Sequence, residues 1–419
     1  MRLRLLTLWE NLRSSYWFVP SLMALVSIVL ALGLVQIDQV VSPSLERKIG
    51  WIYSGGPTGA RAVLSTIAGS VITVAGTTFS VTIAALSLAS SQFGPRLLRT
   101  FRRDLGNQIV LGTFISTFLY CLLVLRTVRG AEQQRYVPGL SVTLGVVLAV
   151  FSLAVLIYFI HHTAASIQVS TLIDSVSRDL ECTIEDNFPA RGKLREEERS
   201  ARQNPTALAQ TQDGETIPVP QRGYLLHTDD RGLLALAERN KCTIQVCCRP
   251  GDFVVAGMPL ASLSPGTCAD GDFRKALQAC FYFGIERTPE QDPEYALLQV
   301  AQIAVRALSP GVNDPFTAIS CIDRLTAAMV MMTERRMWSS FRYDSAGNLR
   351  VVTKPATYKD LTNAAFSFIR RAAESNREVL GHLLNCIRLV LDRVEDQELR
   401  RALQDQYELT AADLKRSAL

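Results

Sequence analysis

Residues 61–93 read RAVLSTIAGSVITVAGTTFSVTIAALSLASSQF, a long apolar segment in which small and hydroxyl-bearing residues recur every three or four positions. In a helix this spacing places them in one stripe, and the large apolar residues between them cover the remaining surface. The stripe consists of Thr66, Gly69, Ser70, Thr73, Gly76, Thr77, Ser80, Ala84, Ser87 and Ser91. In a bilayer, such a stripe either lets neighbouring helices approach closely or borders a wet path.

The rest of the chain supports a membrane location for this segment. The protein has 419 residues, of which 48% are apolar, and the apolar residues are concentrated near the N-terminus. We predict four transmembrane helices at about residues 16–35, 62–92, 108–128 and 140–161. The basic start before the first one lacks a convincing cleavage site, so we interpret this segment as a retained helix. The expected fold class is a membrane α-helical bundle followed by a cytosolic α+β domain.

The arginines predict the orientation. Four of them fall within FGPRLLRTFRRDLG, directly after the second span, and such density at a membrane edge indicates the cytoplasmic side. Both termini are then cytoplasmic. Arg96, Arg99 and Arg103 share one face. They either anchor the helix to anionic headgroups, form an electropositive cytosolic mouth that favours anions, or latch onto carboxylates of the cytosolic domain.

Changes in composition divide the chain into four expected regions: the transmembrane domain (1–165), a stalk helix with a charged linker (166–215), a small β module (216–265) and a mainly helical cytosolic domain (266–419) with a hairpin near 341–353. Within the β module, VCCRPGDFVVAGMPLASL resembles the hammerhead turn of lipoyl-like barrel-sandwich domains. The lysine that such carrier domains modify is absent, so we expect a small structural barrel.

Several functions are disfavoured by the composition. The nine cysteines show no repeated spacing and the chain has four histidines, so we expect reduced cytosolic thiols, no metal site and no cofactor. A net charge of +5 is small for this length and does not indicate nucleic-acid binding. Walker-type loops, nucleophile elbows and HExxH motifs are absent, so we expect no enzymatic activity.

Two further sets of polar residues are candidates for function. His161 and His162 end the fourth span and either reach for interfacial water or sense pH during gating. In ALSPGVNDPFTA, two helix ends meet in a polar turn. The residues expected to converge there are Arg287, Asp292, Arg306, Asn313, Asp314, Thr317, Asp323 and Arg324. Helix capping with internal salt bridges is one interpretation, and a pocket for a phosphate or carboxylate ligand is the other.

Seven stretches, in order along nearly the whole chain, resemble one family of uncharacterised bacterial inner-membrane proteins, the domain of unknown function 2254 family. They are STIAGSVITVAGTTFSVTIAALSLASSQFGPRLLRTFRRD, NQIVLGTFISTFLYCLLVLRTV, IYFIHHTAASIQV, GYLLHTD, RPGDFVVAGMPL, RTPEQDPEYALLQVAQIAVRALSPGVNDPFTA and CIDRL. The resemblance implies a membrane domain followed by a cytosolic domain, and it implies no established activity or site residues.

The leading hypothesis is a homo-oligomeric inner-membrane ion channel or channel-like pore, gated or assembled by the cytosolic domain. The expected pore-lining residues are Thr66, Ser70, Thr73, Thr77, Ser80, Ser87 and Ser91. Its partners would be membrane lipids, other copies of the chain, and ions or a small anionic ligand. The alternative is a non-conducting membrane-anchored sensor or scaffold, in which the stripe packs helices and the cytosolic domain binds a ligand or partner.

Overall fold

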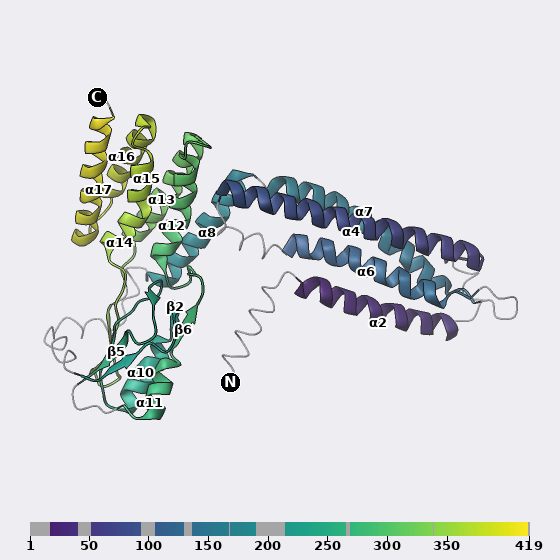
Figure 1. Cartoon of the computed structure of the whole chain (residues 1–419), viewed down its shortest axis with the longest axis horizontal. Coiled ribbons are helices and arrows are strands. Elements are labelled where there is room, and N and C mark those ends of the chain that lie inside the picture. The colour runs from purple at the N-terminus through teal and green to yellow at the C-terminus, as the bar shows by residue number, and fades with distance from the viewer. Residues whose placement is uncertain are drawn as a thin grey trace. The chain divides into compact units, whose positions relative to one another are not determined.

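The computed structural model describes residues 17–40, 52–93, 105–129, 136–166, 168–189, 214–264, 269–337 and 339–417 (Figure 1). The chain forms two compact units, Met1–Thr171 and Leu172–Leu419. The first unit is helical, and the second combines helices with two small sheets.

The first unit is a bundle of four long helices that lie side by side in Figure 1: α2 (Phe18–Val40), α4 (Pro57–Phe93), α6 (Leu105–Thr127) and α7 (Gly139–Ser166). Helix α6 contacts each of the other three. Its most apolar stretch is 56% buried, against 22–28% for the equivalent stretches of α2, α4 and α7. The bundle is therefore built around α6, and each outer helix keeps one uncovered face.

Five of the described helices are long and apolar enough to cross a membrane: α2, residues 57–84 of α4, α6, residues 139–163 of α7, and α13 (Pro315–Thr333). The fifth differs from the others because it lies in the second unit and packs against α12 and α16. It also carries two charged residues, Asp323 and Arg324, that pair with other helices. The expected number of four spans remains a prediction.

The first helix continues past the end predicted from the apolar run. It reaches Val40 and includes Asp38, whose side chain is only 8% exposed. The Leu140 N–H donates to Asp38 Oδ1 at 3.0 Å, and the N–H and hydroxyl of Ser141 donate to Oδ2 at 2.9 and 2.6 Å. Asp38 thus caps the N-terminus of α7, where a negative charge is favourable.

Other polar contacts join the four helices. The Thr117 and Ser152 hydroxyls bond at 3.0 Å between α6 and α7, and both are buried. Tyr120 donates its hydroxyl hydrogen to the Ser141 carbonyl. At one end of the bundle, the Arg61 guanidinium donates to the Val128 carbonyl, just after α6 ends. Hydrogen bonds of this kind between helices help to specify which helices are neighbours.

The second unit begins with α8 (Val169–Asn187), which was expected to be a stalk. One face of α8 is buried, and its charged face bonds to α13 and to the turn after it, through Asp174 with Arg324 and Glu185 with Arg335. This helix is therefore part of the folded unit. The charged linker expected to follow it lies mainly outside the described residues.

The β structure of this unit is assembled from distant segments. The strands are β1 (Thr216–Pro218), β2 (Gly223–Thr228), β3 (Ile244–Val246), β4 (Phe253–Val254), β5 (Pro259–Leu263), β6 (Phe281–Gly284), β7 (Phe341–Tyr343) and β8 (Leu349–Val352). Two short helices, α10 (Asp230–Arg239) and α11 (Gly271–Gln278), lie between them in the chain and contact each other.

The strands form one five-stranded sheet in the order β1-β5-β3-β8-β7 and one three-stranded sheet in the order β4-β2-β6. The module expected at 216–265 is therefore not a self-contained barrel among the described residues. It takes β6 and the β7–β8 hairpin from later in the chain, and β3 pairs with β8 in parallel. The strands are short, and seven of the eight, all except β7, contribute to one shared apolar core that includes Ile217, Leu225 and Leu260.

The remaining helices form a layered cluster: α12 (Pro293–Ala307), α13, α14 (Tyr358–Thr362), η3 (Asn363–Ser367), α15 (Phe368–Ala372), α16 (Arg377–Leu391) and α17 (Gln397–Arg416). Helix α13 packs against α12 on one side and α16 on the other. Asp292 and Asp314 cap α12 and α13, each followed by a proline at the first turn, as the sequence predicts. The segment η3 is one π-helical turn between α14 and α15.

Candidate functional site

The hydroxyl stripe of α4 lies on the outside of the bundle. Among the predicted pore-lining residues, Thr66, Ser70, Thr73, Thr77, Ser80 and Ser87 are all exposed in the single chain. The side chain of Ser91 lies outside the described residues. The opposite face of α4, which includes Leu64, Ala68 and Ala75, is buried against the bundle. The structure therefore turns the stripe away from the other three helices of the bundle.

Each of several stripe hydroxyls donates to a carbonyl of its own helix. Ser70 donates to the Ile67 oxygen at 3.1 Å, Thr73 to Gly69 at 2.8 Å, and Ser80 to Gly76 at 2.9 Å. Thr77 does the same toward Val74 at 2.9 Å. These bonds satisfy the donors, so the hydroxyls tolerate an apolar environment, while their oxygens keep lone pairs available as acceptors.

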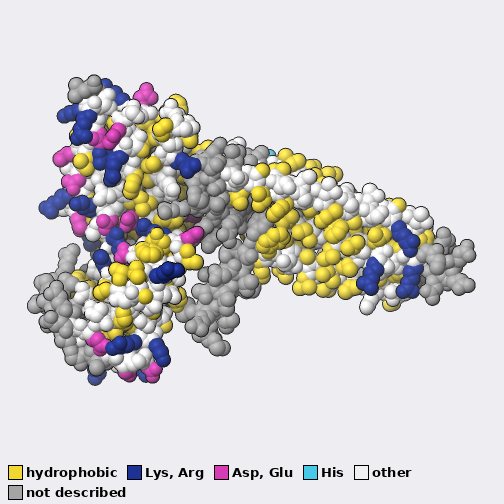
Figure 2. Space-filling model, in the orientation of Figure 1, with side chains coloured by type: hydrophobic (Ala, Val, Ile, Leu, Met, Phe, Trp, Pro, Cys, Tyr) yellow, Lys and Arg dark blue, Asp and Glu magenta, His cyan; other side chains and the backbone are white. Residues whose placement is uncertain are grey.

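The other exposed faces of the bundle have a different character. On α2 and α7 the exposed residues are large and apolar, including Leu25, Val29, Val150 and Ile157. Figure 2 shows a broad apolar surface over this unit, with Lys and Arg gathered near one end. On α4, exposed small and hydroxyl residues alternate with exposed Ile72, Val81 and Ile83. No described atom lies within 4 Å of a Cβ built on Gly69 or Gly76. The stripe of small and hydroxyl residues on α4 is therefore uncovered in the single chain.

The other residues predicted near the membrane have simpler surroundings. His161 is exposed at the end of α7. His162 is half-buried and stacks on Tyr158, with the ring centroids 5.3 Å apart. Arg96, Arg99 and Arg103, the predicted cytosolic mouth, lie outside the described residues. Their place relative to the α4 stripe therefore stays a prediction.

The turn between α12 and α13 is a helix cap. Asp314 accepts from the Thr317 N–H at 3.1 Å and from the Thr317 hydroxyl at 2.6 Å. The hydroxyl bond is the largest cause of a lowered pKa for Asp314. Asn313 has φ of +50°, a left-handed conformation that asparagine tolerates. Both residues thus have a structural role that accounts for their presence in this turn.

The wider convergence expected at this turn does not occur. Arg287 and Asp292 pair with each other at 2.7 Å, where α12 begins. Helix α12 has 15 residues, so about 22 Å separates that pair from the turn after the helix. Arg306 is half-buried in the last turn of α12. Arg287 and Asp292 therefore take no part in the predicted ligand pocket at this turn, and a ligand role for Arg306, Asn313 and Asp314 stays a prediction.

A polar network that the sequence did not indicate surrounds Arg249. Its guanidinium donates to Glu294 on α12 and to Asp360 on α14, both at 2.8 Å. Burial would raise the pKa of Asp360, but the hydrogen bonds from Arg249 and Thr357, together with the Arg249 charge, outweigh it and the pKa is lowered. The two carboxylates line a shallow cavity of about 290 Å³ that also contacts Asn363 of the π-helical turn. The single charge of Arg249 balances only one of the two carboxylates, and its bonds to both tie the sheet region to the helices.

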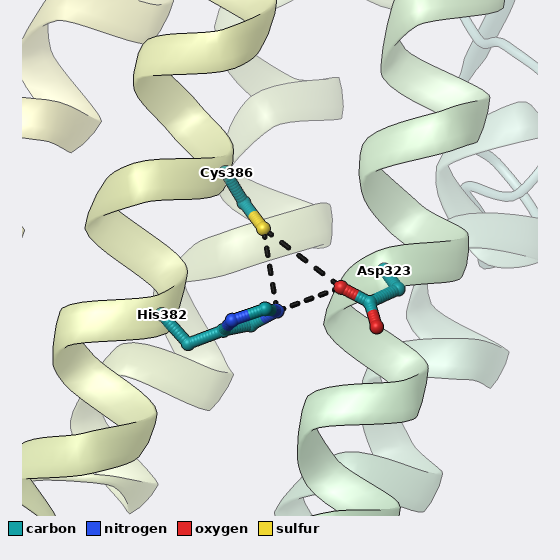
Figure 3. Close-up of side chains that lie close together, drawn as sticks. All are labelled: Asp323, His382 and Cys386. Carbon is teal, nitrogen blue, oxygen red and sulfur yellow. Dashed lines mark hydrogen bonds and ion pairs between the residues drawn. The ribbon is translucent and has the colours of Figure 1, made fainter.

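A second cluster missed by the sequence reasoning joins α13 and α16 (Figure 3). The His382 Nε2 atom lies 2.6 Å from Asp323 Oδ1 and 3.5 Å from the Cys386 sulfur. The sulfur is 4.0 Å from the same carboxylate oxygen. Burial raises the pKa of the Cys386 thiol, and the Asp323 charge adds to this. The spacing of His382 and Cys386, four residues apart on one helix, was a signal available in the sequence.

The fold and these surfaces define a class: a helical membrane protein in which a bundle of long apolar helices precedes a folded α+β unit. The chain belongs to the family described as predicted membrane protein (DUF2254), whose family model matches residues 13–388. It is 33% identical to an uncharacterised protein of Mycobacterium bovis and to one of Mycobacterium tuberculosis. Each match covers 97% of this chain and 77% of the relative. No solved structure matches the chain.

Proposed function

We propose that this protein is a subunit of a homo-oligomeric, channel-like assembly in the bacterial inner membrane. The four helices of the first unit span the bilayer, and α4 faces the other copies around a central path. Both termini and the second unit lie on the cytoplasmic side. The observation that supports this proposal is the exposed stripe of small and hydroxyl residues on α4, whereas the exposed residues of α2 and α7 are large and apolar.

The spacing of small residues on the exposed face of α4 suits contact between copies. Ser65, Gly69, Thr73 and Thr77 follow one another every four residues, and all four are exposed. Such small-residue repeats let helix backbones approach closely in a membrane, where packing and not hydrophobicity drives association. Helix α4 has 37 residues, so it is about 55 Å long and exceeds a hydrocarbon core of about 30 Å. Contacts between copies can therefore continue beyond the bilayer.

A water-filled path is the second part of the proposal. Hydroxyl oxygens along α4 offer acceptors that a permeating ion or water can use. Past Arg61, the described part of α4 has no charged side chain, so ion selection would arise at the mouths. Arg96, Arg99 and Arg103 would favour anions at the cytosolic mouth, and His161 with His162 would make gating sensitive to pH. We propose no enzymatic activity for this protein.

One observation favours a non-conducting alternative. The stripe hydroxyls already donate within their own helix, which suits a dry contact between copies. In that case the assembly is a scaffold or sensor that presents the second unit to a ligand or partner. Both candidates share the contact through α4, and they differ in whether water reaches it.

The contact is tested with two matched glycine variants. In Gly76→Leu and in Gly33→Leu the new side chain meets no described atom of the same chain near its Cβ, so both variants are expected to fold. We expect Gly76→Leu to reduce the oligomer to smaller species in native mass spectrometry, and Gly33→Leu, on the α2 face, to leave it intact. Equal behaviour of the two variants would contradict the proposal.

Conduction is tested separately in liposomes. Thr77→Val keeps the shape of the side chain but removes its hydroxyl, so assembly should persist while anion flux falls. If the wild-type protein passes no ions at any pH or voltage tried, although it is oligomeric, the channel part is wrong and the scaffold alternative gains.

A further inference from the structure

The cluster of Asp323, His382 and Cys386 presents three different ligand types to one point. Asp323 extends from α13, and His382 and Cys386 extend from successive turns of α16 (Figure 3). The three ligand atoms all lie within 4.8 Å of one another. The Cys386 side chain is buried, whereas the imidazole and carboxylate are 34% and 56% exposed. The sulfur therefore forms the floor of the cluster, and the oxygen and nitrogen face solvent.

The geometry does not fit a nucleophilic triad. In such a triad one imidazole nitrogen bonds the nucleophile and the other bonds the carboxylate, so that a proton can pass between them. Here the same nitrogen, Nε2 of His382, is nearest to both the sulfur and the carboxylate oxygen. Because the sulfur and the carboxylate oxygen both contact this one nitrogen, the imidazole cannot pass a proton between them through its two nitrogens. The nitrogen, the sulfur and the carboxylate oxygen can instead each direct a lone pair at one common cation.

The distances are close to those of a tetrahedral metal site. With bond lengths of about 2.0 Å to nitrogen and oxygen and about 2.3 Å to sulfur, ligand atoms lie about 3.3 Å (N to O) and about 3.6 Å (N or O to S) apart. The corresponding distances here are 2.6, 3.5 and 4.0 Å. The largest adjustment is for the imidazole and carboxylate to separate by about 0.7 Å, and these are the two exposed side chains.

We propose that Asp323, His382 and Cys386 form a binding site for a divalent cation of the Zn²⁺ class, with water in the fourth position. One thiolate, one imidazole and one carboxylate form a mixed set that Zn²⁺ accepts, whereas Mg²⁺ and Ca²⁺ require oxygen ligands. The bound cation joins α13 to α16 and so cross-links two helices of the second unit. This inference is independent of conduction and of the contact through α4.

The experiment uses the full chain, purified in detergent with a tag that contains no histidine. Co²⁺ serves as the probe because a cobalt–thiolate bond gives a charge-transfer absorption that carboxylate or imidazole ligands alone do not give. The wild-type protein is compared with Cys386→Ser, His382→Gln and Asp323→Asn. Cys182→Ser is the matched control, since Cys182 is an exposed free cysteine of the same unit.

We expect one Co²⁺ per chain with the charge-transfer band in the wild-type protein, displaced by Zn²⁺. The band should disappear in Cys386→Ser and persist in Cys182→Ser. His382→Gln and Asp323→Asn should weaken binding by about tenfold or more, because removal of even an outer partner of a metal ligand has that effect. Zn²⁺ should also raise the unfolding temperature of the wild-type protein and of Cys182→Ser, and a chelator should reverse this.

Three results would overturn the proposal: no band in the folded wild-type protein, a band that survives Cys386→Ser, or equal binding by the Asp323→Asn and His382→Gln variants and the wild type. Asp323→Asn and His382→Gln change side chains that are 56% and 34% exposed. They test the site even if replacement of the buried Cys386 prevents folding.

Discussion

Asp38 is expected to be one of the largest single contributors to the stability of the membrane bundle. It lies on α2 and accepts three hydrogen bonds from the first residues of α7, two from backbone N–H groups and one from the Ser141 hydroxyl. Both Asp38 and Ser141 are buried. In Asp38→Ala these buried donors lose their partner, and the negative charge at the helix N-terminus disappears.

The size of the effect follows from the three contacts. Loss of a helix N-cap costs about 1–2 kcal/mol, and each additional buried donor left without a partner costs about 1–3 kcal/mol. We therefore expect Asp38→Ala to lower the free energy of unfolding of the bundle by about 4 kcal/mol. Asp38→Asn keeps one acceptor oxygen and should cost about 2 kcal/mol. Ser141→Ala removes one hydroxyl and should cost about 1 kcal/mol.

The assay has to report on the first unit alone. Energy transfer between dyes on exposed positions of α2 and α7 follows the separation of these helices during denaturation in mixed micelles. The order Asp38→Ala, Asp38→Asn, Ser141→Ala, from most to least destabilising, is the expected outcome. A change below about 0.5 kcal/mol in Asp38→Ala, with α2 and α7 still neighbours, would refute the cap as a stabilising contact.

Three further predictions concern other contacts. Thr117→Val and Ser152→Ala each remove one partner of the buried hydrogen bond between these two hydroxyls. A double-mutant cycle should give a coupling free energy of about 0.6 kcal/mol. A coupling of zero would show that this hydrogen bond does not stabilise the bundle. Asp314→Ala removes the α13 cap and should cost about 1 kcal/mol at neutral pH. The hydrogen bond from Thr317 lowers the pKa of Asp314 from 3.8. The contribution of the Asp314 cap to folding stability is therefore present above pH 3.8 and is lost as the pH falls further. The acid unfolding curves of the wild type and the variant should converge at low pH. Arg249→Ala leaves two half-buried carboxylates without their cation and should lower the unfolding free energy of the second unit by about 1–2 kcal/mol, as measured by urea denaturation.

Local sequence signals predicted much of the helical structure. The small-residue period of 61–93 predicted one long helix with a distinct face, and α4 has that face exposed. Asp292–Pro293 and Asp314–Pro315 each predicted a helix start, because the capping side chain and the proline act within one turn. These features depend on neighbours only a few residues away.

Long-range contacts were not accessible in the same way. The pairing of β3 with β8 joins segments about 100 residues apart, and nothing in either short strand specifies its partner. Asp38 did not fit an apolar span, and its use as a cap for α7 depends on how two helices pack. The Asp323 cluster requires α13 and α16 to be neighbours. His382 and Cys386 alone, one turn apart on α16, would have been a weak signal of a metal site.

The most direct test of the central claim is the water accessibility of the α4 stripe in the assembled protein. Thr77→Cys, on the stripe, and Val29→Cys, on the exposed apolar face of α2, are treated in liposomes with a charged, water-soluble thiol reagent. If copies surround a wet path, Thr77→Cys is labelled and Val29→Cys is not. Failure to label Thr77→Cys in an intact oligomer would contradict the wet path, and a monomeric protein in the same liposomes would contradict the contact through α4.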